Sequence, residues 1–435
     1  MAGHRNRDRP SALVLAPILP SDRGNGLAMR AGFLLNAYAE MFDVDLAVVP
    51  VAGEAGEITP YVTRRTRRAN VLSLGMLDTQ FSILSRLSDF EARLQGFHQY
   101  GRPSIAAGVN AALQDALMSW AGDVPYALVH VSRLYLASLA APWLQHETSK
   151  PFLVIDCDED DASAYRRLAR LERKWGRGKR AQWLEAEALA FKRMAIQWLP
   201  QFDLLLAASH GEAHLLRARA GAARISVVPN TIPPSSLADS PAGHAASKRH
   251  DIVFVGNMNY LPNIDAVRWF ALRIWPKVRA AFPCPLRFVV VGSNPPPSVT
   301  ALARGRDIVV TGAVKDVSDF YRSAAIAIAP IRAGGGTRIK LLESAGLGIP
   351  IVATSFSCEG IGFRHGVDLL LADNETEFAA ACVKLLTDQT LALRLADRAS
   401  KKVRKCYDAR SCTQKFLRNL DSYSNLGVFA DGAIA

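Results

Sequence analysis

The chain has 435 residues, of which 49% are hydrophobic and 21% charged, and its formal net charge is +12. That composition excludes a disordered or fibrous protein, and the length favours two domains that each bury a core. The six cysteines form no CxxC pair, which argues against a disulfide framework or a zinc site and favours a reducing compartment.

The first half of the chain predicts a parallel α/β sheet. Strands are expected at 12–20 and 43–51, with a helix at 27–42 between them, and strand, helix, strand begins such a sheet. Residues 60–122 are less regular and receive no assignment. Further apolar runs of strand length lie at 126–132, 151–158, 202–209 and 225–230. We therefore predict a Rossmann-like N-terminal, acceptor-side domain over residues 10–232.

A second domain is expected after a linker. Residues 233–249 are rich in Pro, Ser, Ala and Gly and show no periodicity. A second doubly wound sheet is predicted within residues 250–424, and its last helices could pack back on the first domain. Its strands are expected at 251–257, 286–293, 307–312, 325–331 and 348–355. Because ligands bind at the carboxyl ends of strands in such sheets, we expect a site in a cleft where the two domains face each other.

The strongest chemical signal is the run PIRAGGGTRIKLLESAGLGIPIVATS at 330–355. Its three glycines, Gly334, Gly335 and Gly336, are expected to end a strand. A helix should open near Thr337, where its unpaired backbone donors can face a phosphate. The alternative is an ordinary glycine-rich turn before an amphipathic helix.

Charged residues follow these glycines closely. Arg338 and Lys340 supply positive charge to which Arg332 can add, and Glu343 lies near Lys340 on the helix surface. Cations hold phosphates, and a carboxylate holds ribose hydroxyls. The segment therefore predicts a site for a nucleoside diphosphate, although a Lys–Glu surface pair would have the same spacing.

The turn after the first strand carries Gly24 and Gly26, followed by Arg30. Glycines let backbone amides approach a ligand, and the following helix presents its positive end to anions. G-x-G without a third glycine also fits many tight turns, so both interpretations stay open.

Several stretches, in order, resemble the donor domain of glycosyltransferase family 4, the retaining group 1 transferases of GT-B architecture. One is FVGNMNYLPNIDAVRWF (254–270), which carries the G-x-M-x-Y-x-P-N-x-D-A signature of one branch. The others are WPKV (275–278), FVVVGSNPP (288–296), VTGAVKDVSDFY (310–321), the glycine-rich run and EGIGFRHGVDLLLADNETEFA (359–379). The N-terminal half is similar more loosely, through the first glycine turn and VHVSRLY (129–135).

The resemblance implies transfer of a sugar from a nucleoside-diphosphate sugar, with retention and without a metal or other cofactor. Glu343 would hold the ribose, and the glycine-rich turn with its helix the diphosphate. The main chain from Gly312 to Val314 would meet the base, while Gly24 and Gly26 would face the donor phosphates. His130 falls where family members often place a histidine near the reacting sugar; the residues alone favour burial beside the sheet.

Two positions depart from the family pattern. The first Glu of its E-x7-E motif is replaced by Gly335, which leaves only Glu343. Where many members carry Arg and Lys after the GN strand, this chain has Asn257 and the NYLPN stretch. Stabilising the leaving diphosphate would therefore fall to Arg338 and Lys340, with Arg332 as a further candidate.

Asp156, Asp158, Asp160 and Asp161 could form a D-x-D metal site. They end a strand in a doubly wound half, however, so helix capping, acceptor contact or pairing with basic residues is favoured. We predict no metal site.

A basic cluster spans residues 166–180, beside Trp175 and Trp183. It could lie on an anionic lipid surface, or it could be a solvated helix face with two half-buried tryptophans. No run reaches the roughly 18 apolar residues that cross a bilayer, and no nucleic-acid module accompanies the charge. We expect a cytoplasmic protein, peripheral at the inner face of the membrane, with a lipid-linked or glycan acceptor.

Three other functions fit the architecture. A non-catalytic nucleotide-sugar-binding protein is compatible with Gly335, and a GT-B epimerase needs no acceptor. A nicotinamide-dependent oxidoreductase ranks low because no G-x-G-x-x-G turn is followed by an acidic residue about 20 positions on.

Overall fold

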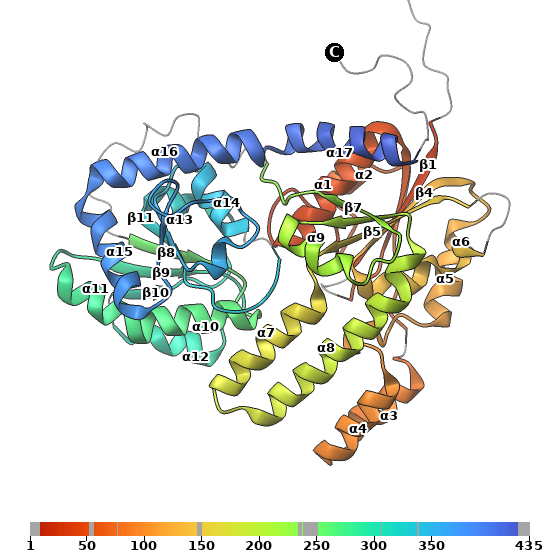
Figure 1. The fold of residues 1–435 in the computed structure, drawn as a ribbon, viewed down its shortest axis with the longest axis horizontal. Helices are drawn as coiled ribbons and strands as arrows, with labels where there is room; N and C mark the ends of the chain where they lie inside the picture. The colour runs from red at the N-terminus through yellow and green to blue at the C-terminus, as the bar shows by residue number, and fades with distance from the viewer. Residues whose placement is uncertain are drawn as a thin grey trace, which may run out of the picture. The chain divides into compact units, whose positions relative to one another are not determined.

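The computed structural model describes residues 9–51, 56–75, 77–145, 150–233, 237, 251–305, 307–336 and 339–424. The chain divides into two compact units: Met1–Pro229 with Cys412–Ala435, and Asn230–Ser411. Each unit is a parallel sheet with helices on its faces (Figure 1). Most of the predicted linker lies outside the described residues, as do Thr337 and Arg338.

The sheet of the first unit has seven parallel strands in the order β3-β2-β1-β4-β5-β6-β7. Its interior strands are continuous apolar runs because helices cover both faces. The order reverses between β1 and β4, as in a doubly wound sheet. The strands are β1 (Ser11–Ala16), β2 (Asp43–Val48), β3 (Arg68–Val71), β4 (Tyr126–Ser132), β5 (Phe152–Asp158), β6 (Leu204–Ala207) and β7 (Arg224–Val227).

Ten helices of the described chain contribute to this unit. They are α1 (Gly26–Met41), α2 (Pro60–Thr63), α3 (Thr79–Arg86), α4 (Phe90–Tyr100), α5 (Ala111–Ala121), α6 (Ala141–Leu144), α7 (Asp161–Lys174), α8 (Gly178–Trp198), α9 (His210–Arg217) and α17 (Ala409–Ser424). Helix α17 belongs here from Cys412 onward, and its Phe416 ring lies 5.6 Å from that of Tyr38 on α1.

Residues 60–122, unassigned from the sequence, hold β3 and four helices. Asp78, Asp89 and Asn110 each cap the helix that follows by accepting backbone N–H groups. These caps are visible in the sequence. The helices they begin are short, however, and have no strong apolar stripe to reveal them.

The second unit has a six-stranded parallel sheet in the order β10-β9-β8-β11-β12-β13. The order reverses between β8 and β11. The predicted class, α/β with two doubly wound sheets, is therefore confirmed. The strands are β8 (Asp251–Val255), β9 (Arg287–Val291), β10 (Ile308–Val310), β11 (Ala324–Ala329), β12 (Ile351–Ala353) and the short edge strand β13 (Leu370–Leu371), which was not predicted.

Helices cover both faces of the second sheet. Phe254 of β8 packs with Phe270 and Phe378 on one face, and Val253 packs with Tyr321 on the other. Adjacent residues of one strand thus point to opposite faces of the sheet and pack in different hydrophobic cores. The helices are α10 (Leu261–Trp269), α11 (Trp275–Ala281), α12 (Pro297–Thr300), α13 (Ser318–Ser323), α14 (Ile339–Gly346), α15 (Glu375–Thr387) and α16 (Gln389–Cys406).

Candidate functional site

The candidate site lies at the carboxyl ends of β8 and β11, between which the second sheet reverses its strand order, and it extends along the ends of β9 and β10. The N–H of Gly256 donates to Val291 at 2.9 Å, and that of Gly292 donates to Gly312 at 3.2 Å. A Cβ on Gly292 would lie 1.9 Å from the carbonyl oxygen of Gly256. Only glycine lets these two strand ends pass so closely, and the close passage leaves backbone exposed at this edge.

Two sequence motifs contact each other at this edge. The first is the signature segment, residues 256–266, and the second is the glycine turn, residues 334–336, with the start of α14. The hydroxyl of Tyr260 lies 3.4 Å from the N–H of Gly335, which donates to it. Gly334 has φ of +108°, and a Cβ there would lie 2.5 Å from that hydroxyl. The glycine turn is thus shaped by contact with the signature segment.

Arg332 joins the same two motifs. Its guanidinium donates to both carboxylate oxygens of Asp265, at 2.7 and 2.9 Å, and lies 4.5 Å from the centroid of the Trp269 ring. Asp265 is buried. Arg332 therefore anchors the segment that leads into the glycine turn, and its predicted contact with donor phosphate stays a prediction.

Lys340 brings a positive charge to the end of β8. Its ammonium donates to the amide oxygen of Asn263 at 2.8 Å and lies 4.1 Å from the centroid of the Phe254 ring. A Cβ on Gly256 would lie 2.9 Å from the same nitrogen. Asn263 in turn donates to the carbonyl of Asn257 at 2.8 Å. The lysine is therefore held over the strand end, where it can stabilise an anion.

Glu343 is half-buried on α14, one turn beyond Lys340. Burial raises the pKa of its carboxyl to about 7; Lys340 opposes that rise and Asp316 adds to it. The buried hydroxyl of Tyr321 donates to the carbonyl of Lys340 at 3.4 Å. Glu343 can therefore exchange between the acid and the carboxylate near neutral pH.

The other predicted residues of this unit lie as follows. Gly312 has φ of +73°, and Val314 is half-buried against the core. Asn257 is exposed, and its side-chain oxygen accepts the N–H of Asn259 at 2.9 Å, which closes a local turn. Their predicted contacts with the donor stay predictions. The predicted roles of Thr337 and Arg338 fall outside the described residues.

In the first unit, Gly24 and Gly26 lie at the start of α1. Gly24 has φ of +96°, Gly26 is the first helical residue, and Asn25 caps the helix by accepting the N–H of Ala28 at 2.9 Å. The N-terminal end of α1 follows β1 directly, as predicted.

Arg30 is buried in the first unit. Its guanidinium donates to both oxygens of Asp156, at 2.6 and 2.7 Å, and to the carbonyl of Val228 at 2.9 Å. Burial opposes the charge, but Asp156 and Asp158 outweigh it and raise the pKa of Arg30. All three guanidinium nitrogens thus have partners within the protein. This gives Arg30 an internal role and leaves its predicted donor contact untested.

His130 is fully buried in β4. Its ring nitrogens lie 3.0 Å from the hydroxyls of Tyr38 and Ser132. Burial lowers the pKa of His130 to about 4, against the opposite effect of Asp156. The ring is therefore neutral at physiological pH, and its predicted place near the reacting sugar stays a prediction.

The acidic cluster after β5 pairs with arginines distant in the sequence. Arg133, buried with φ of +76°, contacts Asp161 at 2.6 Å and Glu159 at 3.1 Å. Asp160 caps α7, as predicted, and pairs with Arg219. These partners lie outside the 166–180 cluster. Within the described ranges, His, Cys, Asp and Glu side chains form no group of three or more that could hold a metal ion.

Comparison with known proteins bears on the second unit most directly. Residues 249–388 match the family model described as Glycosyl transferases group 1. A protein of Klebsiella pneumoniae, described as an uncharacterized 44.6 kDa protein in the cps region, is 23% identical over 168 residues. The matched segment spans 37% of this chain and 43% of that relative.

Solved structures resemble the whole chain. Sucrose-phosphate synthase from Thermosynechococcus elongatus has a TM-score of 0.64 at 14% identity, with 95% of this chain and 99% of that one covered. Anabaena HepE in complex with UDP and glucose has a TM-score of 0.63 at 14% identity, with 95% and 100% covered. These likenesses show the GT-B fold. Of the helices in the described part of the chain, none is long and apolar enough to cross a membrane.

Proposed function

We propose that this protein is a glycosyltransferase of the family 4 branch that carries the signature segment, and that its second unit binds a nucleoside-diphosphate sugar. The observation that carries the proposal is the placement of Lys340. Asn263 of the signature segment and the ring of Phe254 hold its ammonium at the carboxyl end of β8. Doubly wound sheets bind ligands where their strand order reverses. The family match over residues 249–388 supports the same conclusion.

The proposed reaction places negative charge beside this lysine. The bond from the sugar's anomeric carbon to the diphosphate breaks, an acceptor hydroxyl oxygen bonds to that carbon with retention, and the hydroxyl proton leaves with the diphosphate. Lys340, with Arg338, stabilises the charge that develops on the diphosphate. No metal and no cofactor are required in this proposal. Glu343 holds the ribose hydroxyls.

The UDP-bound structures of similar proteins support a uridine nucleotide as the first ligand to test. HepE was solved with UDP and glucose, and an E. coli trehalose-6-phosphate structure with UDP-2-fluoro glucose has a TM-score of 0.61 at 13% identity. Thermal-shift titration with nucleoside diphosphates and their sugars would identify base and sugar together. If none of them stabilised the protein, the proposal would fail.

A non-catalytic nucleotide-sugar-binding protein is the second candidate, favoured by Gly335 at the position of a family glutamate. Incubation with the donor identified by thermal shift separates the two. Release of the nucleotide with transfer to an acceptor, or with slow hydrolysis, supports the transferase. Tight binding without turnover supports the binding protein, and conversion of the donor sugar without an acceptor indicates an epimerase.

The acceptor side of the proposal concerns the first unit. We propose a cytoplasmic protein that contacts an anionic membrane surface through the 166–180 cluster and assembles a surface polysaccharide on a lipid-linked or glycan acceptor. The cps-region relative supports that role. Within the cluster, Arg173 pairs with Glu185, whereas Arg166 and Arg170 are exposed.

A further inference from the structure

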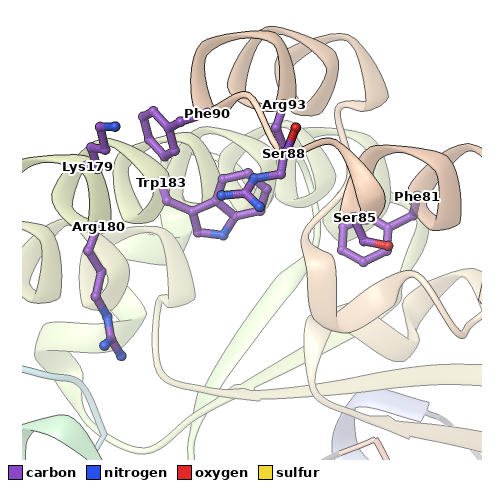
Figure 2. A pocket seen from close by; sticks show the side chains of 8 residues that line it. All are labelled: Phe81, Ser85, Ser88, Phe90, Arg93, Lys179, Arg180 and Trp183. Carbon is purple, nitrogen blue, oxygen red and sulfur yellow. The ribbon is translucent and has the colours of Figure 1, made fainter.

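An open pocket of about 620 Å³ lies on the first unit, where the α3–α4 hairpin packs against the beginning of α8 (Figure 2). Three aromatic rings line it: Phe81 from α3, Phe90 from α4 and Trp183 from α8. The Trp183 ring lies 4.5 Å from that of Phe97, which fixes one of its sides. The pocket therefore offers a preformed apolar surface.

Three cations share this pocket, and its lining contains no acidic side chain. The Arg93 guanidinium lies 5.8 Å from the centroid of the Trp183 ring, and the Lys179 ammonium lies 5.5 Å from that of Phe90. Arg180 pairs with Glu172 at 3.0 Å. Arg93 donates to the carbonyl of Leu87 at 3.4 Å, and among the described residues neither Arg93 nor Lys179 has an acidic partner. Positive charge next to aromatic rings suits a ligand that joins an anion to an apolar group.

Large apolar side chains are exposed on and just before α3. Ile83 is 60% exposed and lies two positions from both Phe81 and Ser85, which places it on the opposite face of that helix, and Leu77, just before the helix, is 46% exposed. Apolar residues exposed on an element that also lines a cationic pocket are typical of a surface that contacts lipid. A bound glycan would find few acceptors for its hydroxyls, because the lining supplies two serine hydroxyls and no carboxylate or amide side chain.

We propose that this pocket binds the phosphate of a lipid, at Arg93 and Lys179, with the hydrocarbon chain against Phe90 and Trp183. The inference deepens the membrane contact proposed above, on which it rests, by assigning that contact to a built pocket and not to the charge of residues 166–180 alone. Helix α7 has 14 residues, which corresponds to about 21 Å. It runs from the carboxyl end of β5 to the turn before Lys179, a span that leaves room for acceptor sugars.

The test compares Lys179→Glu with Lys192→Glu. Both lysines are exposed on α8, so the two variants change the net charge equally. They lie about 20 Å apart along the helix, twice the screening length at physiological salt. Binding is measured to vesicles of phosphatidylglycerol in phosphatidylcholine, to monomeric farnesyl phosphate and to inorganic phosphate.

We expect Lys179→Glu to weaken binding of the lipid phosphate about 30-fold, the effect of reversing one charge at a lipid surface. Lys192→Glu should bind as the unaltered chain does. If Lys179→Glu binds the vesicles more weakly, the ligand is a bilayer lipid. If it binds farnesyl phosphate more weakly, the ligand is a prenyl-linked acceptor. The proposal that the pocket binds a lipid phosphate would be overturned if both variants lost the same amount of binding, or if inorganic phosphate bound as well as farnesyl phosphate.

A second pair of variants tests the hydrocarbon contact. Phe90→Asp should weaken binding of both amphiphiles, while Leu272→Asp, at a residue 55% exposed in the second unit, should not. UDP binding is measured on every variant and should stay unchanged. If the variants weaken lipid binding as expected but UDP binds to none of the proteins, the donor proposal is rejected and the pocket proposal stands. If UDP binds but the variants leave lipid binding unchanged, only the pocket proposal is rejected.

Discussion

The ammonium of Lys340 lies 2.8 Å from the amide oxygen of Asn263, although 77 positions separate the two residues. Asn263 also donates to the carbonyl of Asn257 and is buried. One asparagine therefore sets both the position of the lysine and the turn after β8. Through this contact the signature segment positions the ammonium of Lys340, which belongs to α14.

Replacing Lys340 by alanine should lower kcat about 100-fold to 1,000-fold if its charge stabilises the leaving diphosphate. Steady-state transfer with the donor from the thermal-shift screen measures the effect. Lys384→Ala removes an exposed lysine on α15 and should retain full activity. Equal activity in both variants would exclude the role assigned to Lys340.

Asn263→Ala should weaken donor binding and destabilise the second unit by roughly 1–3 kcal/mol, because two buried hydrogen bonds are lost. Urea unfolding and UDP titration measure the two effects. Asn259→Ala is the control, since Asn259 contributes its backbone N–H and not its side chain to the local turn. The prediction is wrong if the two variants behave alike.

Gly334→Ala should destabilise the second unit for two separable reasons. Its φ of +108° strains any other residue by about 1–3 kcal/mol, and the added methyl would meet the Tyr260 hydroxyl. The double variant Gly334→Ala with Tyr260→Phe should recover only the part due to that hydroxyl, because Cγ of Pro262 would still lie 3.0 Å from the methyl. Gly178→Ala, where a Cβ would have no neighbour within 4 Å, should cost nothing. Full recovery in the double variant would rule out backbone strain.

The raised pKa of Glu343 predicts a pH-dependent effect of Glu343→Gln. Because the folded carboxyl titrates at about 7, above its ordinary value of 4.5, the folded state binds more protons between these pH values. Stability therefore falls as pH rises from 4.5 to 7. The glutamine variant should gain roughly 1 kcal/mol relative to the native chain between pH 5 and pH 8, a figure reduced for solvent screening. Thermal midpoints that differ equally at both pH values would contradict this.

Arg30→Met should destabilise the first unit by about 3–5 kcal/mol, because Asp156 would remain buried without its cation. Adding Asp156→Leu should restore much of the loss, as measured by urea unfolding. If Arg30→Met instead kept its stability and lost UDP binding, the internal role of Arg30 would be wrong and its predicted donor contact right.

The sequence alone predicted both parallel sheets, because parallel strands covered on two faces are continuous apolar runs. It also located the glycine turn before α14, since successive glycines permit a positive φ such as the +108° of Gly334. The edge strands β3 and β13 were missed because they have only four and two residues. Apolar strands and glycine turns depend on residues that are neighbours in the chain, so the sequence alone can predict them.

Contacts between distant residues were decided only by the tertiary structure. Arg332 meets Asp265 across 67 positions, and Arg30 meets Asp156 across 126. Arg332 was a candidate for donor phosphate and Arg30 for donor contact, and both stay predictions; the structure adds that each binds a buried carboxylate. The sequence gives the charge of an arginine but not its ion-pair partner. The partner depends on which strands become neighbours and in what register. Desolvation then decides which charges are held inside the fold and which remain available to a ligand.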